Sequence, residues 1–206
     1  MQNGEIGAIV LAGGKATRLG RNKAVEVIGG QTLIERVVRQ LKTLSSNILI
    51  ITSGKGNGIP HIPDVEIAAD INPDDGPLGG IYTGLAASRC FHNIVVACDM
   101  PFLNTQLLSY MAGLSQDFDA VVPRLDNGYV EPLHAVYSKA CLDSISPRLE
   151  QGQLRVDLFL KDVKVRYIEV EESRRLDPQQ LSFFNINSQS DLDRAIAIAD
   201  GLIGAV

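Results

Sequence analysis

The segment from Leu11 to Lys23 combines the residue types that bind nucleotide phosphates. It reads LAGGKATRLGRNK, and Gly13 and Gly14 come directly after an apolar run. Glycine lets backbone amides approach an anion closely, because no side chain intervenes. The net charge of the protein is −5, yet this segment holds no acid and four cations: Lys15, Arg18, Arg21 and Lys23. This local reversal of charge predicts a phosphate-binding loop, and a solvated basic turn is the alternative.

The spacing of the glycines excludes two familiar phosphate motifs. A Walker loop needs four residues between its glycines and then Gly-Lys-Ser/Thr, whereas five residues separate Gly14 from Gly20 and Arg21 follows. The dinucleotide fingerprint GxGxxG also fails, because Gly13 and Gly14 are adjacent. The predicted loop therefore belongs to neither the P-loop ATPases nor the dinucleotide-binding proteins.

Two further segments supply chemistry at the ends of predicted strands. Asp70 to Gly80 (DINPDDGPLGG) has two prolines and three glycines, which predicts a rigid, closely approachable loop, with an ordinary solvent loop as the alternative. Asp99 follows the apolar run 93–98, and a parallel strand delivers its last residues to the ligand-binding edge of a sheet. A lone carboxylate with bound waters commonly holds Mg²⁺, so Asp99 is a candidate metal ligand. A helix cap or turn before Pro101 is the alternative.

Alternating strand and helix patterns position these segments. Apolar runs predict strands at 6–11, 47–52, 93–98 and 120–123, and helical spacing predicts helices from 33, at 79–88, at 105–114 and after Ser188. Asp126-Asn127-Gly128 predicts a tight turn, after which residues 129–137 return antiparallel. The order predicts an α/β fold of three layers, α/β/α, with a mainly parallel twisted sheet and an antiparallel part.

Length and composition limit the remaining possibilities. The 206 residues, 45% of them hydrophobic, suit one domain over residues 1–206, with a nucleotide-binding part at 1–104 and an acceptor-binding part at 105–206. Three cysteines are too few, and odd in number, for a disulfide framework, which favours a reducing cytoplasm. The acidic charge argues against nucleic acid, and no apolar run approaches the roughly 18 residues of a membrane span. The start of the chain carries no basic leader pattern.

These motifs, in this order, resemble the molybdenum cofactor guanylyltransferase (MobA-like) family, a branch of the nucleotide-diphospho-sugar transferase-type fold. LAGGKATRLGRNK is similar to the family signature LAGGxxxRMGxxK, with Leu19 in place of methionine. The resemblance continues through GPLGG at 76–80, the CDxP pattern at 97–101, EPLH at 131–134, GQLRV at 152–156 and FNIN at 184–187. It covers almost the whole chain.

The resemblance implies transfer of GMP from GTP to the terminal phosphate of molybdopterin, with Mg²⁺ as cofactor and release of pyrophosphate. Lys23 and Asp99 would be catalytic, and Asp99 would bind the metal. The implied nucleotide-binding residues are Leu11, Ala12, Gly13, Gly14, Arg18, Lys23, Ser53, Asp70, Gly79 and Asp99. The implied acceptor-binding residues are Arg155, Asn185 and Asn187, with a helix cap as the alternative for the asparagines. Ser53 stands where the best-known family member has asparagine.

Two other functions stay open. A sister enzyme could use CTP or transfer to a sugar or other phosphate, although LAGG with PLGG favours guanine. Glu131 and His134 depart from the HPTxA variant of their segment, which concerns the acceptor. A catalytically silent nucleotide-binding adaptor is the second alternative, and the presence of both Lys23 and Asp99 speaks against it. The expected partners are GTP, molybdopterin and proteins that deliver the pterin or receive the product.

Overall fold

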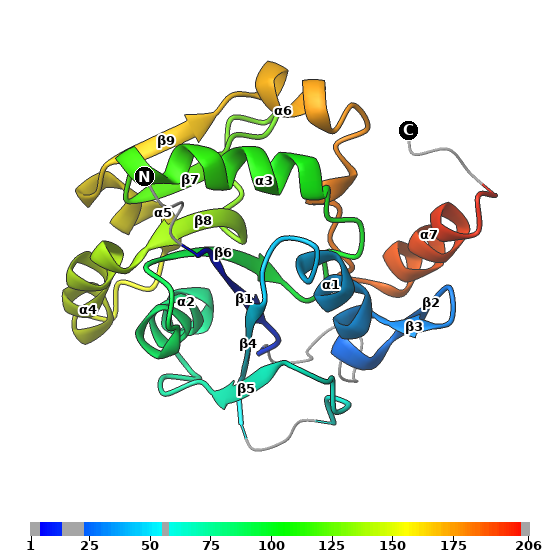
Figure 1. The fold of residues 1–206 in the computed structure, drawn as a ribbon, viewed down its shortest axis with the longest axis horizontal. Helices are drawn as coiled ribbons and strands as arrows, with labels where there is room; N and C mark the ends of the chain where they lie inside the picture. Colours follow the sequence, from blue (N-terminus) through cyan, green and yellow to red (C-terminus); the bar gives the residue numbers. More distant parts are fainter. Residues whose placement is uncertain (1–4, 14–22, 55–57, 203–206) are drawn as a thin grey trace.

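A seven-stranded sheet forms the centre of the computed structural model, which describes residues 5–13, 23–54 and 58–202 (Figure 1). The strand order is β5-β4-β1-β6-β8-β7-β9. β8 is antiparallel to its neighbours β6 and β7, and the other neighbouring pairs are parallel. The strands are β1 (Gly7–Leu11), β4 (Asn47–Thr52), β5 (Glu66–Ala69), β6 (His92–Ala97), β7 (Ala120–Pro123), β8 (His134–Ser138) and β9 (Val165–Ile168).

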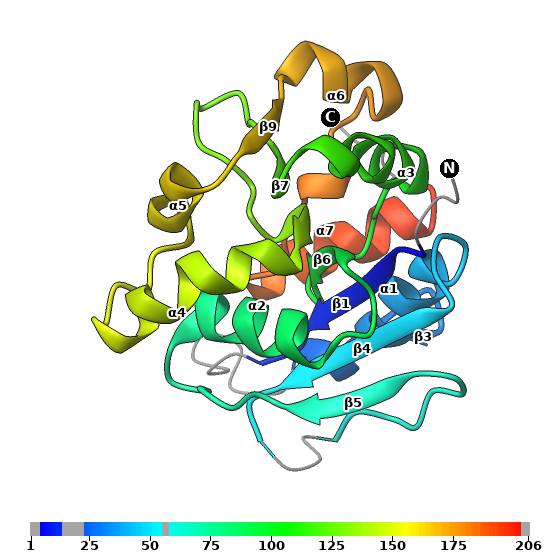
Figure 2. The same cartoon turned by 60° about the vertical axis from the view of Figure 1, so that its left-hand side comes forward.

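Helices cover both faces of this sheet, as Figures 1 and 2 show. α1 and α3 pack on one face, and α2, α4 and α5 pack on the other. The helices are α1 (Leu33–Leu41), α2 (Gly76–Ala87), α3 (Thr105–Leu114), α4 (Leu142–Glu150), α5 (Val156–Phe159), α6 (Val170–Leu176) and α7 (Gln189–Ala199). This arrangement confirms the predicted three-layer α/β fold with a mainly parallel sheet.

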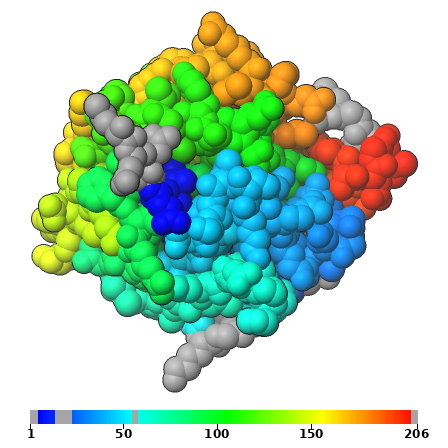
Figure 3. Space-filling view, in the orientation of Figure 1, coloured from blue at the N-terminus to red at the C-terminus, as the bar shows by residue number. Residues whose placement is uncertain are grey.

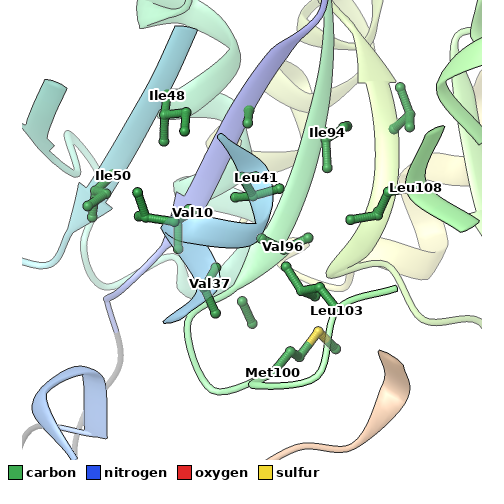
Figure 4. Packing of buried hydrophobic residues seen from close by; sticks show 14 of the residues in the cluster. Val10, Val37, Leu41, Ile48, Ile50, Ile94, Val96, Met100, Leu103 and Leu108 are labelled. Carbon is green, nitrogen blue, oxygen red and sulfur yellow. The ribbon is translucent and has the colours of Figure 1, made fainter. Parts of the chain in front are cut away.

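The central strands are apolar on both faces, because each face is covered by a helix. In β1 the side chains of Ala8 and Val10 join the core under α1 and α3, whereas Ile9 and Leu11 join the core under α2. Figure 4 shows the first of these cores, with Val10 close to side chains of β4, β6 and α1. All five residues of β1 are buried, which explains why a continuous apolar run preceded the glycine-rich loop.

Helix α2 begins earlier than the sequence predicted. It starts at Gly76 rather than Gly79, so the GPLGG motif is the first turn of a helix and only residues 70–75 form the loop. Pro77 explains the difference, since its restricted φ suits the first turn and the amide it lacks would have no partner there. Gly76, with φ of 62°, makes the turn into the helix.

The predicted return strand at 129–137 is shorter than expected but runs in the predicted direction. β8 begins at His134, and only the isolated bridge between Arg124 and Val130 extends the pairing toward the turn. Pro132 explains the late start, because proline has no amide hydrogen to donate to a neighbouring strand. Tyr137 lies inside β8, fully buried, and its hydroxyl donates to the Pro132 carbonyl oxygen at 2.8 Å.

A small outer layer joins the hairpin before α1 to the last helix. The hairpin of β2 (Val27–Ile28) and β3 (Gln31–Thr32) packs against α7, and Figure 3 shows these blue and red segments side by side. Between them lies a small apolar core of buried side chains: Ile28, Leu33, Ile186, Leu192 and Ala195. The described residues contain no helix of the length and hydropathy needed to traverse a bilayer.

Candidate functional site

The strand order reverses direction at β1, and the carboxyl ends of β1, β4, β5 and β6 meet at one edge of the sheet. The chain passes from β1 through α1 to β4 on one side, and from α2 to β6 on the other side of β1. Such a reversal of strand order is where open α/β sheets bind ligands. The first residues beyond β1, β4, β5 and β6 include four predicted site residues: Ala12, Ser53, Asp70 and Asp99.

Three predicted residues meet at this edge. The Nζ atom of Lys23 lies 3.3 Å from Oδ2 of Asp99 and donates to Oδ1 of Asn187 at 3.0 Å. The side chains of Lys23 and Asp99 are only 23% and 20% exposed, so water screens their charges less than at an open surface. Lys23 begins the short 3-10 helix Lys23–Val25 that follows the glycine-rich segment. A cation and two oxygen acceptors from three separate parts of the chain thus form one polar cluster.

The backbone holds Asn187 in this cluster. The Ile186 amide donates to the Asp99 carbonyl oxygen at 3.0 Å, which ties the segment before α7 to the end of β6. Ser188 caps α7 in a capping box with Asp191, and the Asn187 amide also donates to Asp191. The cap of α7 is therefore Ser188, and the Asn187 side chain contacts Lys23 instead. This outcome removes the helix-cap alternative for Asn187.

Glu131 lies near the cluster, although the sequence analysis gave it no role. Its carboxylate accepts a hydrogen bond from the Leu133 amide at 3.2 Å and forms another with the side chain of Asn185. Burial raises the pKa of Glu131, the nearby charge of Asp99 raises it further, and the two hydrogen bonds oppose the rise. The sequence signal that could have identified Glu131 is an acidic residue immediately before Pro132, close to the start of β8.

Ala12 and Gly13, the described start of the glycine-rich segment, pack against the end of β4. The Ala12 amide donates to the Ile51 carbonyl oxygen at 2.8 Å. A Cβ atom on Gly13 would lie 3.0 Å from the amide nitrogen of exposed Ser53, so glycine allows this close approach. Gly14 and Arg18, also predicted to bind nucleotide, lie outside the described residues.

Asp70 and Gly79 shape the loop between β5 and α2. Oδ1 of Asp70 accepts hydrogen bonds from the Thr83 hydroxyl at 2.6 Å and from the Asn72 amide at 3.0 Å. A Cβ atom on Gly79 would lie 2.7 Å from the Asn72 carbonyl oxygen, which makes glycine necessary there. Both residues thus hold the loop against α2, and their contacts with a nucleotide stay predictions.

Arg155 lies apart from the cluster, directly before α5. Its guanidinium forms a two-pronged ion pair with Asp157, with Nε–Oδ1 and Nη2–Oδ2 distances of 3.0 and 2.7 Å. Its side chain is 73% exposed. Two of the predicted acceptor residues therefore lie in or near the Lys23 cluster: Asn187 contacts Lys23, and Asn185 contacts Glu131. The third, Arg155, pairs with Asp157 instead.

The side chains near Asp99 supply charge and oxygen ligands, and none of those described offers a reactive thiolate or a basic imidazole. Burial raises the pKa of Cys98 to about 12 and lowers that of the fully buried His134 to about 3. The described residues hold no group of three or more His, Cys, Asp or Glu side chains suited to a metal. Among the described residues, the side chains gathered here are suited to binding a charged group through a cation and oxygen acceptors.

A polar cluster at the switch-point edge of such a sheet is the arrangement expected of a nucleotidyltransferase. The chain belongs to the MobA-like NTP transferase domain family, whose model matches residues 8–164. Two relatives are similar over most of both chains. A probable molybdenum cofactor guanylyltransferase of Pelotomaculum thermopropionicum is 35% identical, with 93% of this chain and 92% of the relative covered. The molybdenum cofactor guanylyltransferase of Desulfosudis oleivorans is 34% identical, with 92% and 93% covered.

Solved structures show the same fold. Molybdopterin-guanine dinucleotide biosynthesis protein A of Archaeoglobus fulgidus superposes with a TM-score of 0.81 at 28% identity, covering 94% of this chain and 98% of that one. The 2-C-methyl-D-erythritol 4-phosphate cytidylyltransferase of Thermus thermophilus gives 0.70 at 18% identity, covering 95% and 99%. The second likeness is one of fold alone.

Proposed function

We propose that this protein transfers GMP from GTP to the terminal phosphate of molybdopterin, releasing pyrophosphate and forming the guanine dinucleotide cofactor. The observation that carries this proposal is the meeting of Lys23, Asp99 and Asn187 at the switch-point edge of the sheet. The names of the two relatives and of the Archaeoglobus fulgidus protein support the choice of guanine nucleotide and pterin acceptor.

The proposed chemistry needs no strong base from the protein. An oxygen of the acceptor phosphate attacks the α-phosphorus of GTP, the bond from the α-phosphorus to the bridging oxygen breaks, and pyrophosphate leaves with that electron pair. A phosphate monoester has a second pKa of about 6, so the nucleophile is already mostly dianionic at neutral pH. Lys23 would then turn from Asp99 to the transferring phosphate and stabilise the charge that develops there.

Mg²⁺ is the cofactor that we propose for this site. Oδ2 of Asp99 and Oδ1 of Asn187 already converge on one cation, the Lys23 ammonium, and Mg²⁺ prefers oxygen ligands of this kind, completed by water and phosphate oxygens. Bound Mg²⁺ would supply neutralisation of the phosphate charge. Asp99 would hold it, and Asn187 would orient the groups around it.

A direct assay of nucleotide and acceptor choice tests this function. The full chain is incubated with Mg²⁺, each of the four NTPs in turn and a molybdopterin source, and pyrophosphate release is measured. GTP with molybdopterin is expected to give the fastest release, and removal of Mg²⁺ with a chelator is expected to stop it. Preference for CTP, or release only with a sugar phosphate, would assign the protein to a sister activity. Nucleotide binding without release under any condition would favour the silent adaptor.

We also propose a cytoplasmic setting. All three cysteines, Cys90, Cys98 and Cys141, are free thiols, as expected in a reducing compartment. Proteins that deliver the pterin or receive the dinucleotide product are the proposed macromolecular partners. Pull-down of the full chain with and without bound product tests this, and product-dependent capture of a molybdoenzyme precursor is the expected result.

A further inference from the structure

Tyr129 is held by a short, well-bonded turn between β7 and β8. The Leu125 amide donates to the Tyr129 carbonyl oxygen at 2.8 Å, and the Gly128 amide donates to the Leu125 carbonyl oxygen at 2.9 Å. The Tyr129 amide donates in turn to Oδ1 of Asn127 at 3.0 Å. Three hydrogen bonds within five residues fix the backbone from which the aromatic ring projects.

Side-chain contacts also fasten this turn to the neighbouring elements. Arg124 lies 3.6 Å from a carboxylate oxygen of Glu169, and its guanidinium carbon lies 4.4 Å from the centre of the Tyr167 ring. Asp126 pairs with Arg174 of α6 at 2.7 Å. Although the turn is anchored on both sides, the Tyr129 side chain is left 73% exposed. The ring therefore projects into solvent from an anchored backbone.

Tyr129 lies near two residues of interest, Glu131 and Arg155. Val130 bridges to Arg124, and the Glu131 amide donates to the Pro123 carbonyl oxygen at 2.9 Å, so the backbone there is extended along the end of β7. Residues two apart in an extended chain face the same side, which places Tyr129 on the side of Glu131. Tyr129 also lies close enough to Arg155 to act on it electrostatically. Tyr129 is thus a neighbour of Glu131 along the chain and of Arg155 in space.

We propose that the Tyr129 ring is the platform on which the flat ring system of the acceptor stacks, with the Arg155 guanidinium beside it as a hydrogen-bond donor. This inference rests on the proposed function, because that function requires a phosphate-bearing pterin as acceptor. A pterin presents a planar π-face, and an exposed tyrosine stacks on such a face. Asp157 holds the guanidinium in one orientation before any ligand arrives, which reduces the entropy lost on binding.

Phe91 provides a matched control for this platform. It is also a highly exposed aromatic residue, 57% exposed, but it precedes β6 and therefore lies at the opposite, amino edge of the sheet. Single exposed apolar side chains are common on protein surfaces, so exposure alone distinguishes neither residue. Only the location beside the polar cluster separates Tyr129 from Phe91, and the two variants test that difference.

The test compares Tyr129→Ala, Tyr129→Phe and Phe91→Ala in the full chain. With GTP, Mg²⁺ and molybdopterin, Tyr129→Ala is expected to raise the KM for the acceptor by about tenfold or more, as loss of one stacking contact does, with the KM for GTP unchanged. Tyr129→Phe keeps the ring and is expected to stay close to wild type, as is Phe91→Ala. Thermal melting of each variant checks that the fold is retained.

A binding measurement separates failure of this inference from failure of the proposed function. Titration with 6-hydroxymethylpterin monophosphate, followed by pterin fluorescence, is expected to show about tenfold weaker binding to Tyr129→Ala, and glycerol phosphate is expected to distinguish none of the variants. If wild type binds the pterin but transfers no GMP, the proposed function fails while the platform stands. If Tyr129→Ala retains wild-type pterin affinity and acceptor KM, or if Tyr129→Phe is impaired as much as Tyr129→Ala, stacking is overturned.

Discussion

The two edges of the central sheet each hold an ion pair between distant residues, yet the pairs differ in their surroundings. At the carboxyl edge, the Lys23 and Asp99 side chains are 23% and 20% exposed and share a third polar group, Asn187. At the amino edge, Arg89 lies 2.6 Å from Glu66, but these side chains are 77% and 64% exposed. They line an open groove of about 360 Å³.

This difference shows that a short distance between opposite charges does not define a site. The exposed pair is the closer of the two, but water and salt screen it, and such pairs contribute about 0–1 kcal/mol to stability. The half-buried pair is longer, and with Asn187 it forms a cluster assembled from three parts of the chain. Its charges are less screened, and they stand where four parallel strands deliver their ends. Substituting both pairs in parallel tests whether this contrast is functional.

Substitution of the carboxylates is expected to give the largest contrast. Asp99→Ala removes the proposed Mg²⁺ ligand and is expected to lower turnover by about 10³-fold or more, the scale of losing a group essential to charge stabilisation. Glu66→Ala removes the acid of the exposed pair and is expected to leave turnover unchanged. Pyrophosphate release and thermal melting are measured on both. A fully active Asp99→Ala protein would contradict the metal assignment.

Substitution of the cations is expected to give a slightly smaller contrast. Lys23→Ala is expected to reduce kcat by about 10²–10³-fold, because the positive charge acts on the transferring phosphate. Arg89→Ala is expected to change neither kcat nor KM and to cost at most about 1 kcal/mol of stability. Steady-state kinetics over a range of GTP concentrations distinguish the cases. An increase in KM alone for Lys23→Ala would make Lys23 a binding residue only.

Comparing substitutions of Asn187 and its neighbour Ser188 distinguishes an effect on the site from an effect on the stability of α7. Asn187→Ala removes one acceptor from the cluster and is expected to lower kcat by about tenfold, in the range for one hydrogen bond to a charged group, with little change in Tm. Ser188→Ala removes the cap of α7 and is expected to cost about 1 kcal/mol of stability with activity retained. The same activity loss in both variants would mean that Asn187 acts only through the fold.

Glu131→Gln is expected to have the smallest effect, on the pH dependence of stability. Burial raises the pKa of Glu131 above its ordinary value of 4.5, so the folded protein binds more protons than the unfolded chain and stability falls as pH rises through this range. Glutamine keeps a hydrogen-bond acceptor for the Leu133 amide but does not ionise. The variant is therefore expected to melt higher than wild type at pH 7, with the difference shrinking below pH 4.5. Thermal melts from pH 4 to 8 check this, and a constant difference across that range would contradict it.

Local patterns predicted the fold well where a single physical signal dominated. The strands Asn47–Thr52 and Ala120–Pro123 and the helix Thr105–Leu114 occur with the predicted bounds, because each is a continuous apolar or periodic segment. Proline caused the two main errors, by starting α2 at Gly76 and by delaying β8 to His134. Edge strands β5 and β9 were missed, since their partly exposed residues lack a buried-strand pattern.

The site was harder to predict, because its contacts are long-range. Lys23 and Asn187 touch although 164 positions separate them, and no local pattern encodes that approach. Lys23 was named as a cation of the predicted phosphate-binding segment, whereas its catalytic role and the choice of Asn187 came from the family resemblance. Glu131 was missed because its role depends on contact with Asn185 and proximity to Asp99, which only the folded structure reveals. Asp70 and Gly79 were interpreted as ligand contacts, whereas the structure also gives each a local packing role.

The long reach of the Lys23–Asn187 contact also determines when, during synthesis, the cluster can exist. Domains begin to fold from the amino end while the ribosome is still adding residues, at about 5–20 residues per second. The strands of the nucleotide side are complete by residue 97, but the third member of the cluster emerges only with residue 187. Every shorter nascent chain therefore lacks the complete cluster. The polar cluster at the carboxyl edge is therefore completed only when the segment before α7 has emerged from the ribosome.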